Sequence, residues 1–536
     1  MLDFLNPLPE SELSLFPSQV EALQELHASK IGGCLCMGVG SGKTYVSFLA
    51  ADALGGEETL LFVPPRLLEQ SQREYTKLSR SFALKPCDWV KYSQLSLRTW
   101  EKTQANIVAS AKGKNLVVVF DEAHMLRHKS SARTKRALRL LADLSKVCAL
   151  KVVVMSGTLL NGVASHYWHL VASALHDKHW LPMDQRTLAK LDAALLQAQS
   201  GRSNYVHARH CEYLNGIADP ESNTMRWYVP KDEFLDGYAK AIRATVGSVL
   251  SARTDVGATL RIDTWATPRL GQQAAALYRQ AELGMHPGGY QLPGPMEIAT
   301  CLKQLSLGFY YDWEWPGGKD MEWLAARNEW SRLCRHELEN HSRPGYDTQM
   351  MVAQKVDSMR EPDRDKQALC AAWRAWCEVR HKTPPVTKPR WVDDTFLRSV
   401  LQEAERSPMI VWYGHSAVAQ WLGERGMRVY HAGQDVDEDG KHSVALSIQS
   451  HGTGLNLQQF DRQLFTHLPS QSKTWEQAIG RSHRVGQKAD EVHVLVPRHT
   501  RVVRNSLTKA IEDAQYVQQV SGTGQKLLQA TVVFEH

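Results

Sequence analysis

The chain has 536 residues, of which 43% are hydrophobic and 22% charged, a composition that is ordinary for a folded globular protein and excludes wholesale disorder. This length exceeds what one hydrophobic core usually serves, so two or three domains are expected. The formal net charge of +6 is compatible with a nucleic-acid partner but does not by itself indicate one.

Several classes of protein are excluded by patterns that the sequence lacks. No apolar run is long enough to span a bilayer, and the first residues lack the basic region of a secretory signal. The nine cysteines are scattered and form no Cys-x-x-Cys pair that would indicate zinc. We therefore expect a cytoplasmic protein in a reducing compartment, without membrane contact.

Two parts of the chain share a pattern of short apolar runs that alternate with longer helical stretches. Runs rich in β-branched residues are typical of strands that are buried on both faces in a parallel sheet. The first part contains GGCLCM (32–37), TLLFVPP (59–65), NLVVVFDEAH (115–124) and KVVVMSGT (151–158). The second part contains PMIVWYGH (408–415), MRVYHAG (427–433), SVALSIQSHGTG (443–454), RQLFTHLP (462–469) and EVHVLVP (491–497). The sequence therefore predicts two separate α/β lobes.

Between the two lobes, from His166 to Arg390, the strand pattern stops and the sequence has a helical pattern. Near the end of this region, HKTPPVTKPRW (His381–Trp391) has the proline spacing of a linker. We therefore predict a first lobe over residues 1–165, a mainly helical insertion with its linker over 166–390, and a second lobe over 391–536.

The insertion is also rich in tryptophan. Trp323 and Trp330 lie seven residues apart, the spacing that places both side chains on one face of a helix. We interpret this face as helix core. Stacking on unpaired bases and docking of a partner protein are the alternatives.

A phosphate-binding loop is indicated by MGVGSGKTYVS (37–47), which follows a predicted strand and opens a predicted helix. Gly40 and Gly42 allow the backbone N–H groups around Ser41 to point at phosphate oxygens. Lys43 would reach the β- and γ-phosphates, and the Thr44 hydroxyl would bind Mg²⁺. The alternative is an ordinary glycine-rich turn between a strand and a helix.

Two adjacent carboxylates follow the buried strand of NLVVVFDEAH, at the end of a strand where ligands bind in α/β sheets. Asp121 is placed to hold Mg²⁺, and Glu122 to orient and deprotonate an attacking water. Ahead of the phosphate-binding loop, Gln19 in FPSQVEAL offers an amide that can both donate and accept at the edge of adenine. A solvated loop and an exposed helix glutamine are the respective alternatives.

The stretch EQAIGRSHRVGQK (476–488) concentrates positive charge in the second lobe. Arg481 and Arg484 lie three residues apart, so on a helix both guanidinium groups would project from one face. Within this stretch, only Glu476 offers a carboxylate to neutralise them. The pair is therefore expected to bind a polyanion.

Taken in order, these motifs resemble those of superfamily-two helicases, and within them the SWI/SNF-type translocases of double-stranded DNA. The matching segments are FPSQ (16–19), GSGKT (40–44), FVPPRLLEQ (62–70), DEAHMLRHKSS (121–131), MSGTLLNG (155–162), SHGTGLNLQ (450–458) and QAIGRSHRVGQ (477–487). The basic residues and serine after DEAH, together with the HRVGQ ending, favour the SWI/SNF branch. The short, tail-less chain resembles a viral or bacterial member, so the expected location is a bacterial or virus-infected cell.

The resemblance implies two RecA-like lobes that close on ATP and Mg²⁺. Arg481 and Arg484 would then act as arginine fingers on the triphosphate, with Gln477 and Gly454 also facing the nucleotide. A basic helix face on nucleic-acid phosphates is the alternative for the arginines. The residues implied in coupling the phosphate site to lobe movement are His124, Ser156 and Thr158.

The resemblance also implies contacts to the backbone of double-stranded DNA, which would be largely independent of sequence. The residues implied are Arg66, Tyr92, Gly414, Ser450 and Thr453. The predicted protein is therefore a nucleic-acid-dependent ATPase that moves along duplex DNA. The alternatives are a strand-separating helicase, a nucleotide-gated DNA clamp or loader with little turnover, and a motor that moves on RNA.

Overall fold

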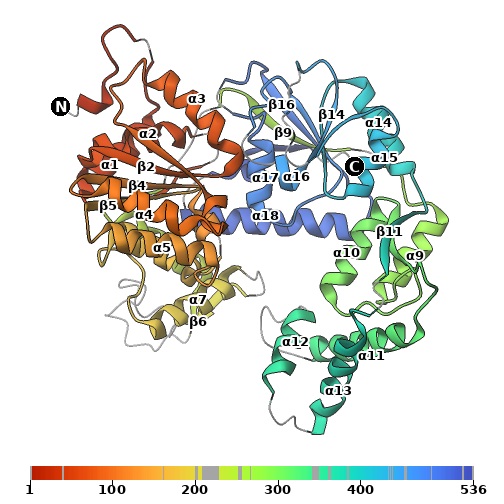
Figure 1. Cartoon of the computed structure of the whole chain (residues 1–536). Helices are drawn as coiled ribbons and strands as arrows, with labels where there is room; N and C mark the ends of the chain where they lie inside the picture. The colour runs from red at the N-terminus through yellow and green to blue at the C-terminus, as the bar shows by residue number, and fades with distance from the viewer. Residues whose placement is uncertain are drawn as a thin grey trace.

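The computed structural model contains two parallel β-sheets, each between layers of helices, and a smaller helical body beside the second sheet (Figure 1). It describes residues 3–533 apart from 12, 39–40, 158, 161, 200–202, 208–227, 251–255, 266, 341–348, 360–363, 383–384, 432–433, 435, 437–438, 452–454, 485 and 522–523. This arrangement confirms the predicted fold class of two α/β lobes with a mainly helical insertion.

The first sheet has six parallel strands in the order β3-β2-β4-β5-β1-β8. The strands are β1 (Gly32–Cys36), β2 (Glu58–Val63), β3 (Cys87–Lys91), β4 (Asn115–Asp121), β5 (Ala149–Met155) and β8 (Ser248–Leu250). The helices of this lobe are α1 (Pro17–Ser29), α2 (Lys43–Leu54), α3 (Leu68–Leu78), α4 (Trp100–Ala111), α5 (Ala132–Leu144), α6 (Trp168–Leu175), α7 (Gln185–Gln199) and α8 (Lys231–Arg243).

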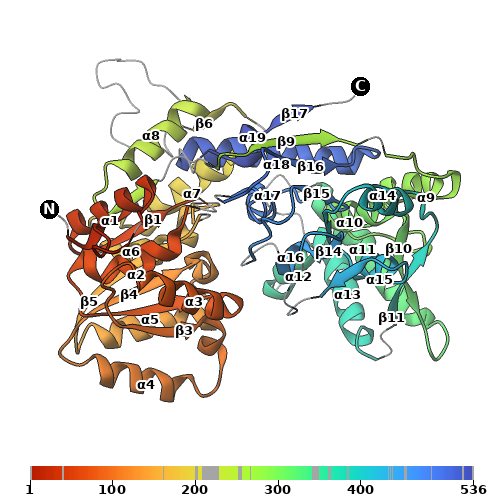
Figure 2. The same cartoon turned by 90° about the horizontal axis from the view of Figure 1, so that it is seen from above.

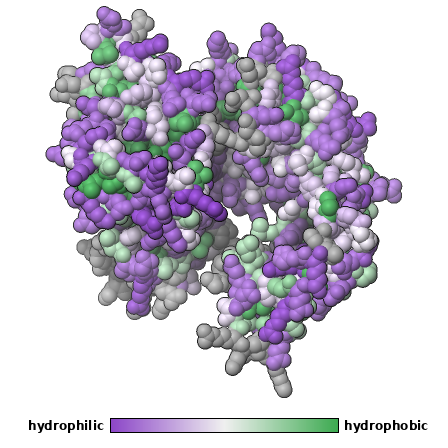
Figure 3. All heavy atoms as spheres, viewed as in Figure 1, coloured by the Kyte–Doolittle hydropathy of each residue, from purple (hydrophilic) through white to green (hydrophobic). Residues whose placement is uncertain are grey.

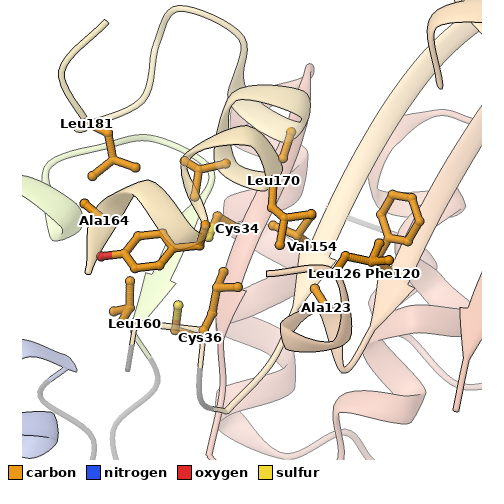
Figure 4. Packing of buried hydrophobic residues seen from close by; sticks show 14 of the residues in the cluster. Cys34, Cys36, Phe120, Ala123, Leu126, Val154, Leu160, Ala164, Leu170 and Leu181 are labelled. Carbon is orange, nitrogen blue, oxygen red and sulfur yellow. The ribbon is translucent and has the colours of Figure 1, made fainter. Parts of the chain in front are cut away.

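Side chains of β4 alternate between two cores because successive residues of a strand point to opposite faces of a sheet. Val117 and Val119 pack with α1 and α2, whereas Val118 and Phe120 pack with α5 and α6. Figure 4 shows part of the second core, where Leu170 of α6 lies near Val154 of β5. Burial on both faces explains why the strand sequences are continuously apolar.

The second sheet has seven parallel strands in the order β13-β14-β12-β15-β16-β9-β17. They are β9 (Thr259–Thr264), β12 (Ile410–Tyr413), β13 (Arg428–Tyr430), β14 (Val444–Ser447), β15 (Arg462–Phe465), β16 (Glu491–Val496) and β17 (Thr531–Val533). Its helices are α14 (Thr395–Arg406) and α15 (Ser416–Gly423) in one core, with α16 (Ile448–His451), α17 (Ser472–Ile479), α18 (Arg501–Ser521) and α19 (Lys526–Gln529) around the other.

The expectation that strands stop between residues 166 and 390 is wrong. β8 completes the first sheet beside β1, and β9 lies in the second sheet between β16 and β17. The sequence did not indicate β9 because this strand is not continuously apolar. Leu260 and Ile262 are buried, whereas Arg261 and Asp263 lie on the other face of the strand. The two sheets therefore divide the chain between β8 and β9.

The helical body comprises α9 (Gln272–Glu282), α10 (Pro295–Ser306), α11 (Met321–Glu339), α12 (Gln349–Ser358) and α13 (Arg364–Val379). The sequence read as a linker contributes β11 (Val386–Trp391), which pairs antiparallel with β10 (Phe309–Glu314) in a two-stranded sheet. Trp330 is fully buried between α11, α12 and α13, and Trp323 is 5% exposed. The interpretation of these two tryptophans as core is confirmed, and the docking of a partner protein here stays a prediction.

Helix α18 joins the two lobes (Figures 1 and 2). Its first half packs in the core of the second sheet through Val503 and Leu507, and its second half packs against α8 of the first lobe through Tyr516 and Val520. Figure 3 shows a mainly hydrophilic face with a hollow between the first lobe and the helical body. None of the described helices combines the length and the apolar character needed to cross a bilayer.

Candidate nucleotide site between the two lobes

The phosphate-binding loop lies between β1 and α2. Gly42 caps the start of α2 with φ +71°, in the left-handed region that favours glycine, and a Cβ there would lie 2.2 Å from the Gln19 amide nitrogen. Ser41 Oγ donates to the Gly38 carbonyl at 2.8 Å. Lys43 Nζ donates to the Met37 carbonyl at 3.2 Å. The loop therefore starts a helix whose free N–H groups suit an anion, as the sequence predicts.

Gln19 is 1% exposed and holds this loop from α1. Its Oε1 accepts from the Phe16 backbone N–H at 2.7 Å, and its Nε2 donates to the Gly42 carbonyl at 2.9 Å. Gln19 thus contacts the phosphate-binding loop. However, both ends of its amide bind the chain itself, so in this structure Gln19 positions the loop and presents no free edge to adenine.

Asp121 and Glu122 lie at the carboxyl end of β4, across from Lys43. The Glu122 carboxylate is 3.8 Å from Lys43 Nζ, and Asp121 Oδ1 accepts from the Glu122 backbone N–H at 3.0 Å. Glu122 has φ +53° and ψ 47°, a left-handed conformation that is uncommon for glutamate and is characteristic of functional sites. The structure thus brings the loop lysine and both carboxylates together.

Glu122, His124 and Ser156 form a polar triangle that links the end of β4 to the end of β5. His124 Nδ1 lies 3.0 Å from Ser156 Oγ and 3.1 Å from Glu122 Oε2. Ser156 Oγ donates to the same carboxylate oxygen at 3.5 Å. A change at the Glu122 carboxylate can therefore reach the segment that follows β5. The third residue predicted for coupling, Thr158, lies outside the described residues.

The two carboxylates differ in their pKa. Burial and the neighbouring Glu122 raise the pKa of Asp121 to about 7. Burial also acts to raise the pKa of Glu122, but Lys43 and His124 outweigh it and hold this pKa below its usual range. The hydroxyl of Thr44 and the carboxylate of Asp121 are the oxygen ligands that Mg²⁺ prefers, and a cation beside Asp121 would offset the cost of its buried charge. The donor set therefore fits a magnesium ion that arrives with a nucleotide.

Arg481 follows the end of α17 in the second lobe and is nearly buried. Its Nε donates to the Gln477 carbonyl at 2.8 Å and its Nη1 to the Leu455 carbonyl at 3.0 Å. Burial and the nearby Arg484 lower the pKa of Arg481 to about 10, against the opposing charge of Glu122 in the first lobe. Arg481 is thus held by two carbonyls of its own lobe, where the charge of Glu122 acts on it.

The geometry of the arginine pair differs from the expectation. α17 ends at Ile479, so Arg481 and Arg484 lie in the turn after it and do not share a helix face. Burial lowers the pKa of Arg484, and the opposing charge that acts on it belongs to Glu74 on α3 of the first lobe. Different acidic groups of the first lobe therefore act on the two arginines, Glu122 on Arg481 and Glu74 on Arg484.

Lys473, on the first turn of α17, was missed by the sequence analysis. Burial lowers the pKa of Lys473 to about 8, and the charges that act on it come from the first lobe: Glu122 opposes this change, whereas Arg127 and Lys43 add to it. A cation is disfavoured near a helix N-terminus, and this misplaced charge is the signal that could have drawn attention to Lys473. The charge of Glu122 thus acts on Lys473 as well as on Arg481 of the second lobe.

Of the residues implied in nucleic-acid binding, Tyr92 is corrected by the structure. It is fully buried, and its hydroxyl donates to the Asp121 carbonyl at 2.8 Å, so it supports the end of β4 and does not reach a ligand. Ser450 is half-buried on α16. Gly40, Thr453, Gly454 and the side chain of Arg66 lie outside the described part of the chain.

Residues 12–159 match the family described as type III restriction enzyme, res subunit, which is a family of helicase-type ATPases of superfamily two. The matched segment runs from before α1 to just beyond β5 and contains the phosphate-binding loop, Asp121 and Glu122. No curated protein matches the chain. The first lobe is thus similar to the ATP-binding lobe of helicase-type motors, whereas membership of the SWI/SNF branch stays a prediction.

Proposed function

We propose that this protein is a motor that hydrolyses ATP with Mg²⁺ and moves along double-stranded DNA. The observation that carries the proposal is that charged groups of the two lobes act on one another. Glu122 of the first lobe acts on Lys473 and Arg481 of the second, at the edge of the first sheet where Lys43 and Asp121 lie. A nucleotide at this edge would be held by one lobe and touched by the other.

In the proposed reaction, Glu122 accepts a proton from water as the water oxygen attacks the γ-phosphorus and the bond to the β-phosphate oxygen breaks. Lys43 and the guanidinium groups of Arg481 and Arg484 stabilise the charge on the transferring phosphoryl group. Bound Mg²⁺ would neutralise part of the phosphate charge, held by Thr44 and Asp121. Loss of the γ-phosphate removes the group that both lobes contact, which favours lobe opening.

Lobe opening and closing become movement when each lobe also binds the nucleic-acid backbone. The support for duplex DNA as the track is the sequence resemblance in the segments around residues 121–131 and 477–487. Strand separation, RNA as the track and a clamp with little turnover remain the competing functions.

Two assays with purified full-length protein separate these functions. We expect ATP hydrolysis to rise severalfold with duplex DNA over single-stranded DNA, because the proposed track is the duplex. Equal stimulation by RNA would contradict duplex DNA as the track. In a triplex-displacement assay, we expect the third strand to be released during hydrolysis while the duplex stays paired. Hydrolysis without release would favour the clamp, and separation of the duplex would favour the helicase.

A further inference from the structure

The C-terminal segment, which contains α19 and β17, packs against the second lobe. It lies next to α17, the helix that precedes the turn with Arg481 and Arg484. α19 contacts α17, and β17 forms the edge of the second sheet beside β9. Lys526, the first residue of α19, is 6% exposed although it is a lysine, and the neighbouring Leu527 belongs to the core of this lobe. Lysine is almost never buried unless it is paired, so its contacts require an explanation.

Lys526 donates hydrogen bonds to the stretch 476–484 from both its side chain and its backbone N–H. Its Nζ donates to the backbone carbonyl of His483 at 3.1 Å and lies 3.1 Å from His483 Nδ1. Its backbone N–H donates to Glu476 Oε1. One residue of the C-terminal segment therefore binds the end of α17 and the turn after it, on either side of Arg481.

The imidazole of His483 is fixed by these contacts in a single neutral form. A lysine ammonium group can only donate, so Nδ1 accepts and the ring hydrogen lies on Nε2. Nε2 is 2.9 Å from the carbonyl of Ala258, the residue directly before β9, and donates to it. Burial and Lys526 lower the pKa of His483 to about 4, in agreement with a neutral ring. His483 is thereby held between the C-terminal segment and the sheet.

Glu476 is removed from the arginines by the same segment. In the stretch 476–488, Glu476 is the one carboxylate that could neutralise Arg481 and Arg484. In the structure, Glu476 is buried against the backbone N–H groups of Lys526 and Leu527. Burial raises the pKa of Glu476 to about 7, and the charge of Lys526 opposes this change. The carboxylate is therefore engaged with α19.

We propose that Lys526 is a positioning residue for the two arginines of the nucleotide site. Its contacts with the carbonyl and ring of His483 fix the residue directly before Arg484, and its contact with Glu476 fixes the helix end before Arg481. The turn that carries both guanidinium groups is thereby held in place against α17 and α19. This inference rests on the proposed ATP hydrolysis, because its effect is measured as turnover.

Lys526→Met tests this role. The variant keeps the backbone contact to Glu476 but removes both donors to His483. We expect kcat for ATP to fall by about 10²-fold, the typical effect of a small misplacement of catalytic groups, with the KM for ATP changed little. Lys488→Met, which removes an exposed lysine from the same region, is the matched control and should retain wild-type turnover.

A double variant separates positioning from folding. Lys526→Met removes the positive charge that acts on the buried carboxylate of Glu476, which destabilises the fold. Glu476→Gln in the same chain removes the charge of this carboxylate, so the double variant should recover thermal stability while kcat stays low, because His483 still lacks its donor. Recovery of kcat together with stability would show that Lys526 has only a structural role.

A readout without ATP completes the test. Backbone hydrogen exchange over residues 479–487 should be faster in the double variant than in wild type, because the turn loses the contact at His483. Unchanged exchange with unchanged kcat would overturn the inference. A wild-type protein and a Lys488→Met control that do not hydrolyse ATP would instead contradict the proposed function.

Discussion

Glu122→Gln should abolish turnover of ATP while leaving its binding intact. The amide keeps the size of the side chain but cannot accept the proton of the attacking water, and a general base contributes about 10² to 10⁴ in rate. Loss of the negative charge also removes the repulsion that the γ-phosphate would meet from this carboxylate, so the affinity for ATP should be equal or higher. Steady-state hydrolysis and binding of a fluorescent ATP analogue measure the two quantities.

The position of Glu122 makes this prediction specific. Its carboxylate contacts Lys43 and His124, and its backbone has a left-handed conformation that is uncommon for glutamate. Glu101→Gln, which makes the same chemical change at an exposed position on the first turn of α4, is the matched control and should hydrolyse ATP normally. Hydrolysis at the wild-type rate by Glu122→Gln would show that another group accepts the proton.

Replacement of either Arg481 or Arg484 by alanine should slow hydrolysis strongly without preventing the binding of ATP to the first lobe. An arginine finger is worth about 10³ to 10⁵ in rate because it stabilises charge that develops in the transition state. Single-turnover hydrolysis, measured with enzyme in excess over ATP, separates this chemical step from product release.

The two arginines should differ in their effect on stability. Arg481 donates to the carbonyls of Gln477 and Leu455, so its removal breaks two hydrogen bonds within the second lobe and lowers the thermal stability as well. Arg332→Ala is the matched control, because Arg332 is exposed and pairs with Glu329 on its own helix. Turnover within about twofold of wild type in both finger variants, a range set by the precision of such rates, would assign these arginines to a structural or nucleic-acid-binding role.

The sequence predicted those parts of the fold in which a single physical requirement determines the residue types. Strands such as β4 are buried on both faces, so their sequences are continuously apolar, and the phosphate-binding loop requires glycine where φ is positive at Gly42. β9 was missed because one of its faces is polar. β11 was mistaken for a linker because proline is tolerated at Pro389, in a two-stranded sheet where every strand is an edge.

The sequence predicted the site residues that lie in local motifs, but not those whose role depends on contacts between distant segments. Lys43, Asp121 and Glu122 lie in contiguous motifs, and the structure brings them together. The role of Lys526 becomes visible only when distant segments meet, since nothing in the sequence next to Lys526 indicates that it contacts His483. Tyr92 was assigned to nucleic acid by its place in the chain, but its burial depends on the packing of the whole lobe.

The central claim is that one lobe binds the phosphates of a nucleotide and the other lobe reaches across to touch them. A crystal structure of the protein with ADP, Mg²⁺ and aluminium fluoride, which mimics the transferring phosphoryl group, tests it most directly. We expect a guanidinium nitrogen of Arg481 or Arg484 within hydrogen-bonding distance of a fluoride, about 3 Å, with Glu122 beside the attacking water. Closed lobes in which both guanidinium groups point away from the nucleotide would contradict the account.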